Sequence, residues 1–200
     1  MDDLVTDPEP HPARRADARR NRDRLIAAAL DQFAEHGSDA TVVGIARVAG
    51  VGVGTLYRHF PTRAQLVMAA YGAELDRVCD AAPALLADHD PAEAVRLWVD
   101  SFIEYLTSKF GIADAVRDAV AAGAPDPRSR ERLRAAMTLL FDAAARAEVI
   151  RSDVDVDDIG LTLLGIAMAA DSPAMAAQRR RMIDLVLAGL ATPGSRLAAR

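Results

Sequence analysis

The residues best suited to contact a ligand lie close together in the stretch GVGVGTLYRHF, residues 50–60. Three glycines alternate with valines, and a threonine, a tyrosine, an arginine and a histidine follow within the next five positions. Glycines at this density are typical of a loop whose backbone approaches a phosphate closely. The residues after them are instead typical of a short helix with a polar and aromatic outer face. The stretch therefore has three possible interpretations: a nucleotide-binding loop, a catalytic turn, or the beginning of a helix that reads DNA.

The glycines fit neither of the common phosphate-binding motifs. A phosphate loop of the GxxxxGK[ST] type needs a lysine after its last glycine and a β-strand in front. Here Leu56 and Tyr57 follow Thr55, and the only lysine of the chain is Lys109. The dinucleotide motif GxGxxG fails as well, because Thr55 stands at its last glycine position and no β-α-β pattern surrounds it. The sequence therefore argues against a nucleotide site.

A helix-turn-helix accounts better for the same stretch. This motif needs two short helices joined by a tight turn that contains glycine. The pattern predicts helices over 41–48 and 53–59, with Gly50 in the turn. The apolar residues expected to pack inward are Ile45, Ala46, Ala49, Val51 and Leu56. The residues left facing outward, where a major groove could receive them, are Val53, Thr55, Tyr57 and Arg58.

Helical patterns also fill the rest of the chain. Ile26, Leu30 and Phe33 recur at helical spacing, and Thr62 and Gln65 are spaced as a capping box at another helix start. The predicted helices span 16–36, 41–48, 53–59, 62–87, 91–108, 112–122, 127–147, 156–170 and 173–190. No segment alternates apolar and polar residues as a strand does, so we predict an all-α protein.

Charge is distributed unevenly along the chain. The net charge is −5, but residues 10–72 hold nine arginines against five acids, whereas residues 1–9 hold four acids and no base. A basic segment on an acidic protein is a candidate surface for a polyanion such as DNA. Residues 1–15, which contain three prolines and several acids, are expected to form a disordered tail.

Composition argues against several other classes of protein. No run of 18 uncharged apolar residues predicts a membrane span, and the acidic N-terminus does not resemble a signal peptide. The single cysteine, Cys79, allows no internal disulfide and fits a reducing cytoplasm. The chain shows no histidine–carboxylate metal pattern at helical spacing and no paired base for Ser101 or Cys79. We therefore predict no metal, no cofactor and no enzymatic activity.

Residues 41–71, TVVGIARVAGVGVGTLYRHFPTRAQLVMAAY, resemble the DNA-binding signature of the tetracycline-repressor (TetR) family of bacterial transcription regulators. The segments IARVAGV, GTLYRHF and TRAQL stand in the family's order and spacing, after a first helix that ends in FAEHG. The resemblance implies a three-helix DNA-binding domain over 16–72, followed by a helical ligand-binding and dimerisation domain over 73–200. It implies DNA contacts from Thr41, Arg47, Val53, Gly54, Thr55, Tyr57, Arg58, His59 and Arg63.

The resemblance also assigns roles to individual residues. Thr41 would cap its helix and touch a phosphate, and Arg63 would hold the flanking DNA backbone. His59 has two possible roles, a phosphate contact or a buried histidine at a helix end. Two residues depart from the family's pattern: Gly52 replaces a common serine or threonine, which removes a side-chain cap, and Gly44 replaces a common acid.

Large apolar side chains in the C-terminal part suggest a ligand pocket between helices. The predicted lining is Trp98, Phe102, Tyr105, Met137, Phe141 and Met168. A simple packed core is the alternative interpretation of the same residues. Since no charged residue accompanies the aromatic face, we expect a small-molecule effector that is largely apolar or aromatic.

One short recognition helix covers few bases, so two half-sites and a homodimer are expected. The predicted interface consists of Leu163, Ile166, Ala167 and Ala170 on one helix and of Met182, Leu185, Val186 and Leu190 on the next. Two such helices from each subunit would form a four-helix bundle. The leading hypothesis is a repressor that binds an imperfect inverted repeat in double-stranded DNA and that a small molecule releases. The alternatives are an interaction module that does not bind DNA, and an enzyme.

Overall fold

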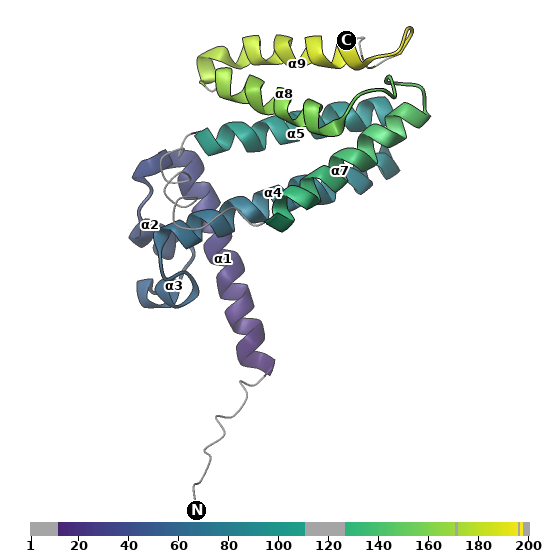
Figure 1. Cartoon of the computed structure of the whole chain (residues 1–200). Helices are drawn as coiled ribbons and strands as arrows, with labels where there is room; N and C mark the ends of the chain where they lie inside the picture. Colours follow the sequence, from purple (N-terminus) through teal and green to yellow (C-terminus); the bar gives the residue numbers. More distant parts are fainter. Residues whose placement is uncertain (1–11, 111–126, 171, 196, 198–200) are drawn as a thin grey trace, which may run out of the picture.

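The computed structural model describes residues 12–110, 127–170, 172–195 and 197, and the regular elements within these ranges are helices (Figure 1). The protein is all-α, as the sequence predicts. The predicted helix at 112–122 and residues 1–11 of the predicted tail lie outside the described residues.

Three helices form an N-terminal head. They are α1 (Pro12–His36), α2 (Val42–Val48) and α3 (Val53–His59), with the short 3-10 helix η1 (Gly37–Asp39) between the first two. Leu25 and Phe33 of α1 share a buried core with Ile45 of α2 and Leu56 of α3. The helix α1 begins four residues earlier than predicted, so residues 12–15 are helical and do not belong to a disordered tail. Its first residue, Pro12, suits a helix start because a backbone N–H has no partner there.

Gly50 forms the tight turn between α2 and α3 that the sequence predicts. Its φ is +65°, which only glycine adopts without steric cost. The N–H of Gly50 donates to the carbonyl of Arg47 (3.1 Å), and the N–H of Val51 donates to the carbonyl of Ala46 (3.0 Å). These two bonds complete the end of α2 and direct the chain into α3.

Longer helices form the C-terminal body. They are α4 (Arg63–Asp88), α5 (Pro91–Phe110), α7 (Pro127–Arg146), α8 (Val156–Ala169) and α9 (Ala176–Leu190), and the 3-10 helix η2 (Pro173–Met175) precedes the last of them. The helix α4 packs against α1 of the head and against α5 and α7 of the body, so it joins the two parts. The helices α8 and α9 pack against each other on the side of the body that is remote from α3 (Figure 1).

The capping box predicted at the start of α4 is confirmed. The hydroxyl of Thr62 accepts a hydrogen bond from the N–H of Gln65 (3.1 Å), and the side-chain oxygen of Gln65 accepts one from the N–H of Thr62 (3.2 Å). This reciprocal pair fixes the position at which α4 leaves the head.

Candidate nucleic-acid interface

The solvent face of α3 carries side chains that can read DNA. Leu56 is 1% exposed and anchors the helix, whereas Tyr57 is 47% exposed and Arg58 also lies at the surface. The hydroxyl of Thr55 accepts a hydrogen bond of 2.9 Å from Nη2 of Arg58, one helical turn away. This bond holds the guanidinium along the outer face of α3, where it can bind a phosphate or the O6 and N7 atoms of a guanine.

Two glycines flank Val53 at the start of α3, and Val53 itself is half-buried and packs against the core. Gly52 occupies the N-cap and supplies no side-chain hydrogen bond, as the sequence predicts. A Cβ added at Gly52 or at Gly54 would meet nothing within 4 Å. The protein's own packing therefore does not require these glycines, and their effect is to let another surface approach the backbone of α3 closely.

The helix α2 presents a second surface beside α3. The hydroxyl of Thr41 accepts the N–H of Gly44 at 3.0 Å, which confirms the predicted cap. Arg47 is exposed, and Val43, one turn before it, is 65% exposed. Val43 is missing from the predicted contacts, although helical spacing could have placed it on the face opposite buried Ile45.

Gly44 lies where α2 approaches α1. A Cβ at this position would lie 3.1 Å from the side-chain oxygens of both Gln32 and Thr41. This glycine departs from the family's pattern, and the structure shows that it makes room for a side chain of α1 and for the α2 cap.

Arg63 begins α4, but its guanidinium turns toward the head. Nη2 donates to the carbonyls of Ser38 (2.9 Å) and Ala40 (3.4 Å), and the guanidinium lies 5.7 Å from the centroid of the Phe33 ring. The side chain is half-buried. Arg63 therefore braces the connection between α1 and α2, a role that differs from the DNA-backbone contact implied by the resemblance.

A surface hollow of about 410 Å³ lies between α1 and the end of α3. Its lining consists of Ala18, Arg19, Arg22 and Asp23 from α1 and His59 from α3. His59 is half-buried. It is therefore partly covered, as a histidine at a buried helix end would be, and partly accessible to a phosphate. The uneven charge along the chain pointed to the whole N-terminal segment, but only the structure distinguishes Arg19 and Arg22 from the other arginines.

The aromatic residues predicted to line a ligand pocket form a packed core. Trp98 is 0% exposed and stacks on Phe102 with ring centroids 5.1 Å apart, and Phe102 stacks on Tyr105 at 6.2 Å. Met137 and Phe141 of α7 are buried in the same core. A hollow of about 490 Å³ lies on the outer face of α7 instead, and Glu131, Arg134, Ala135, Thr138, Leu139, Asp142 and Arg146 line it.

The prediction that Met168 lines the pocket is wrong. It is 58% exposed on α8, so it does not line the interior.

An acidic residue lies near the tyrosine end of the aromatic core. Burial, together with the nearby charge of Glu74, raises the pKa of both Tyr71 and Tyr105 above the ordinary range. The expectation that no charge accompanies this face is therefore wrong, because Glu74 approaches it from α4.

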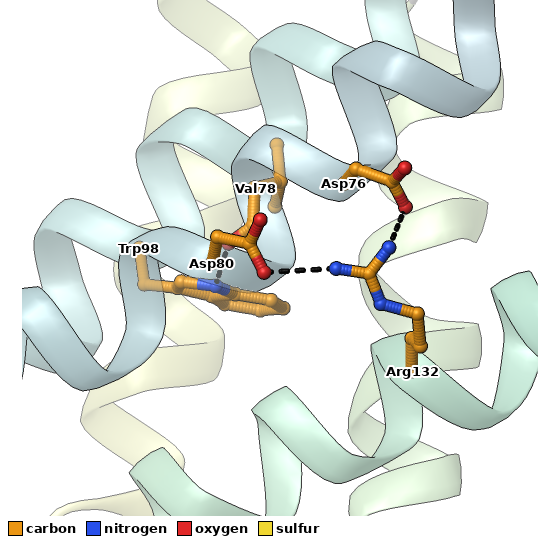
Figure 2. A network of polar contacts seen from close by, with 5 residues as sticks. All are labelled: Asp76, Val78, Asp80, Trp98 and Arg132. Carbon is orange, nitrogen blue, oxygen red and sulfur yellow. Dashed lines mark hydrogen bonds and ion pairs between the residues drawn. The ribbon is translucent and has the colours of Figure 1, made fainter. Parts of the chain in front are cut away.

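Three polar contacts attach α5 and α7 to α4, as Figure 2 shows. Nε1 of Trp98 donates to the carbonyl of Val78 at 2.9 Å. The guanidinium of Arg132, on α7, forms an ion pair with Asp76 and a second, 2.8 Å ion pair with Asp80. Because Asp76 and Asp80 are one helical turn apart, a single arginine holds two successive turns of α4.

The predicted dimer stripes face the interior of the subunit. The buried residues of these stripes are Leu163, Ile166, Ala167, Ala170 and Leu190, and Met182 and Val186 are half-buried. The strongest apolar stripe of each helix packs against the subunit's own core, which is why the pattern misled the prediction. Of the predicted residues, Leu185 does lie at the surface, where it is 73% exposed, and Leu161 of α8 is 68% exposed.

The described helices include none that is both long and apolar enough to cross a membrane. Within the described ranges, no three His, Cys, Asp or Glu side chains are grouped as ligands for a metal ion.

Known proteins match both parts of the fold. Residues 25–70 match the family described as "Bacterial regulatory proteins, tetR family", and residues 90–192 match "Transcriptional regulator SbtR-like, C-terminal domain". The crystal structure of TetR transcriptional regulator SCO0520 from Streptomyces coelicolor is 50% identical, with a TM-score of 0.77, over 86% of this chain and 99% of that one. A TetR transcription regulatory protein from Mycobacterium vanbaalenii is 33% identical, with a TM-score of 0.66, over 89% of this chain and 99% of that one.

A further relative matches part of the chain. The HTH-type transcriptional regulator SAR0097 of Staphylococcus aureus (strain MRSA252) is 35% identical over 68 residues, which are 32% of this chain and 35% of that protein. This chain thus matches about a third of that regulator's length. The matches to the head, to the body and to whole solved structures agree with one another. The chain belongs to the TetR family of bacterial transcriptional regulators, a family of regulators and not of enzymes, and it is a DNA-binding regulator of transcription.

Proposed function

We propose that the protein is a homodimeric repressor that acts in the cytoplasm on an imperfect inverted repeat and that a small molecule releases from DNA. The observation that carries the proposal is the outer face of α3. Leu56 fixes this helix in the head while Tyr57 and Arg58 remain at the surface. The resemblance to two solved TetR regulators extends over nearly the whole length of those chains, which supports the same conclusion.

Each element of the head has a distinct part in this proposal. The guanidinium of Arg58, held by Thr55, reads a guanine in the major groove. The hydroxyl of Tyr57 binds a phosphate, and the missing side chain of Gly54 lets base edges approach α3. Thr41 and Arg47 of α2 bind the backbone beside the groove, which positions α3 without reading sequence.

We place the dimer interface on the outer face of α8 and α9. Leu161 and Met168 of α8 and Leu185 of α9 are 68%, 58% and 73% exposed, a high exposure for large apolar side chains. Gly165 and Gly189, also exposed, allow a partner's helices to approach closely. The same two helices from a second subunit would cover this face as a four-helix bundle. The helices α8 and α9 lie on the side of the body remote from α3, so a dimer formed through them leaves both recognition helices uncovered (Figure 1).

The effector acts through α4 in this proposal. A ligand changes DNA affinity only if it binds one arrangement of the heads better than another. The helix α4 contacts the head through Arg63 and the body through Arg132 and Trp98, so a shift of α5 or α7 reaches the head through these contacts. A largely apolar or aromatic effector that separates α5 from α7 would produce such a shift. Glu74 would add an acceptor for a polar group of the effector.

The test is selection of bound duplexes from a random pool by the full-length protein, followed by footprinting. We expect a common imperfect inverted repeat that two subunits occupy. Equal affinity for all duplexes, or a footprint on a single half-site by one subunit, would overturn the proposal. Absence of any salt-dependent DNA binding would favour a module that binds only protein or small molecules.

A further inference from the structure

The N-terminal half of α1 is a projecting and basic part of the head. Figure 1 shows that it extends beyond α2 and α3, away from the C-terminal body. Residues 16–20 are exposed on every side of the helix. A helix that buries no side chain along these turns gains little stability from them, so their role is better sought in binding.

The arginines of this segment differ in their contacts. Arg20 forms an ion pair with Asp17, and Arg24 donates a hydrogen bond of 2.5 Å to the side-chain oxygen of Asn21. Among the described residues, Arg19 has no hydrogen-bond or ion-pair partner, and Arg22 makes only a cation–π contact, 5.3 Å from the centroid of the Phe60 ring. Among the described side chains of this segment, Arg19 and Arg22 are therefore the arginines that keep all of their hydrogen-bond donors available.

These two arginines lie around the hollow that His59 reaches from α3. Arg22 stacks on Phe60, the residue directly after His59, so α1 is attached to the end of the recognition helix at this point. Among the described residues of the lining, Asp23 is the acidic one, so the two guanidinium groups outweigh one carboxylate. The hollow is thus a cationic site that continues the DNA-facing surface of α3.

We propose that this hollow binds a backbone phosphate of the DNA that flanks the groove read by α3, with Arg19 and Arg22 as its principal ligands and His59 as a third. Guanidinium groups bind phosphate oxygens through paired, charge-assisted hydrogen bonds. The proposal rests on the DNA-binding function above, and it adds a phosphate outside the helix-turn-helix contacts. Each subunit would therefore contact DNA beyond its half-site, and the first helix would set how far the protein extends along the duplex.

The experiment compares two double variants that remove the same charge. Arg19→Ala/Arg22→Ala removes the proposed ligands, and Arg20→Ala/Arg24→Ala removes neighbours already engaged with Asp17 and Asn21. Operator affinity is measured by fluorescence anisotropy over a series of salt concentrations. For the first variant we expect a loss of about tenfold or more at fixed salt. Its salt slope should fall by about 0.9 per lost phosphate, which is roughly two for a dimer. For the second variant, the loss of operator affinity and the fall in salt slope should each be less than half of those of the first.

A second measurement locates the phosphate. Single backbone phosphates outside the half-site are replaced, one at a time, by neutral methylphosphonates. One position should weaken binding by the wild type and have no further effect on Arg19→Ala/Arg22→Ala. Equal losses from the two double variants, or the same methylphosphonate profile for wild type and variant, would overturn the proposal. Failure of the wild type to bind any duplex would instead refute the DNA-binding function on which it rests. Circular dichroism and sedimentation of each variant show whether fold and assembly are retained.

Discussion

The indole Nε1 of Trp98 donates a 2.9 Å hydrogen bond to the backbone carbonyl of Val78, which connects α5 to the middle of α4. Both residues belong to the buried core. Pro83 lies inside α4 a little further along and cannot donate to the carbonyl of Cys79, so the helix lacks one of its own hydrogen bonds close to this contact. The attachment of Trp98 thus supports α4 where its own hydrogen bonding is incomplete.

Replacing Trp98 by phenylalanine should destabilise the body. The change removes the hydrogen bond and leaves unfilled volume in a close-packed core, at a cost of about 2–3 kcal/mol in the free energy of unfolding. Urea denaturation followed by circular dichroism at fixed protein concentration measures the difference. Leu139→Ala is a suitable control because Leu139 is 41% exposed, and it should change stability by less than about 0.5 kcal/mol. Similar stability of Trp98→Phe and wild type would contradict the importance of this bond.

Variants of the outer face of α3 should separate recognition from folding. Arg58→Ala should weaken binding to the selected operator by about 1–3 kcal/mol and relax the preference for one base pair. Thr55→Val keeps the guanidinium but removes the hydrogen bond that orients it, so a smaller loss at the same base pair is expected. Anisotropy titrations with operator and with single-base variants measure both effects. A loss that is uniform across all sequences would assign Arg58 to phosphate contact alone.

The bracing role of Arg63 predicts an effect on the head itself. Arg63→Ala removes hydrogen bonds to the carbonyls of Ser38 and Ala40, and it should weaken local stability by about 1–2 kcal/mol. Faster amide hydrogen exchange in α2 is the direct measurement, and weaker operator binding should follow from it. Exchange rates equal to those of the wild type, with weakened binding, would restore the direct phosphate contact implied by the family resemblance.

Charged substitutions on the proposed dimer face should dissociate the dimer. Leu185→Asp places a charge in the centre of the proposed bundle, and it should convert the protein to monomers at micromolar concentration in sedimentation velocity. Leu139→Asp is the matched control, because Leu139 is also an exposed leucine but lies on α7. If both variants sediment alike, or if Leu185→Asp remains a dimer, the interface lies elsewhere.

Cys79 predicts a pH dependence that one variant can isolate. Burial raises the pKa of the thiol from its ordinary value of 9.0 to about 11. Since the folded state binds the proton more tightly than the unfolded chain, the contribution of Cys79 to stability is complete below pH 9 and is lost as the pH rises to 11. The free energy of unfolding should therefore fall more steeply over this range for the wild type than for Cys79→Ala. Tyr71 and Tyr105 are present in both proteins and contribute to both curves, so parallel curves would contradict the prediction for Cys79.

The helix-turn-helix could be predicted because its signals are local. Gly50 must adopt a positive φ, and the spacing of Ile45 and Leu56 fixes the inward faces of two adjacent helices. These requirements are met within about 20 residues of sequence, so no knowledge of the rest of the fold is needed. The cap formed by Thr41 and the capping box of Thr62 are local in the same sense.

Contacts between distant segments could not be predicted from the sequence. A helical stripe shows which side chains are buried but not what buries them, so the sequence places Leu163 and Ile166 against a partner although their own subunit covers them. Arg63 reaches carbonyls more than 20 residues away, and its spacing in the sequence does not show this. Arg19 and Arg20 are adjacent in sequence, and only the structure shows that one is paired while the other borders a hollow.

The length of α4 has a consequence for the size of the motion that regulation requires. With 26 residues and a rise of about 1.5 Å each, the helix is about 39 Å long. A tilt of only about 5° about one end displaces the other by about 3.4 Å, which is the rise of one base pair. In a symmetric dimer the two heads would move in opposite directions, so the separation of the recognition helices would change by roughly two base pairs of a duplex whose turn is about 10 base pairs. Because such helices would then meet the duplex at the wrong angular phase, an effector could abolish operator fit without breaking any contact inside the head.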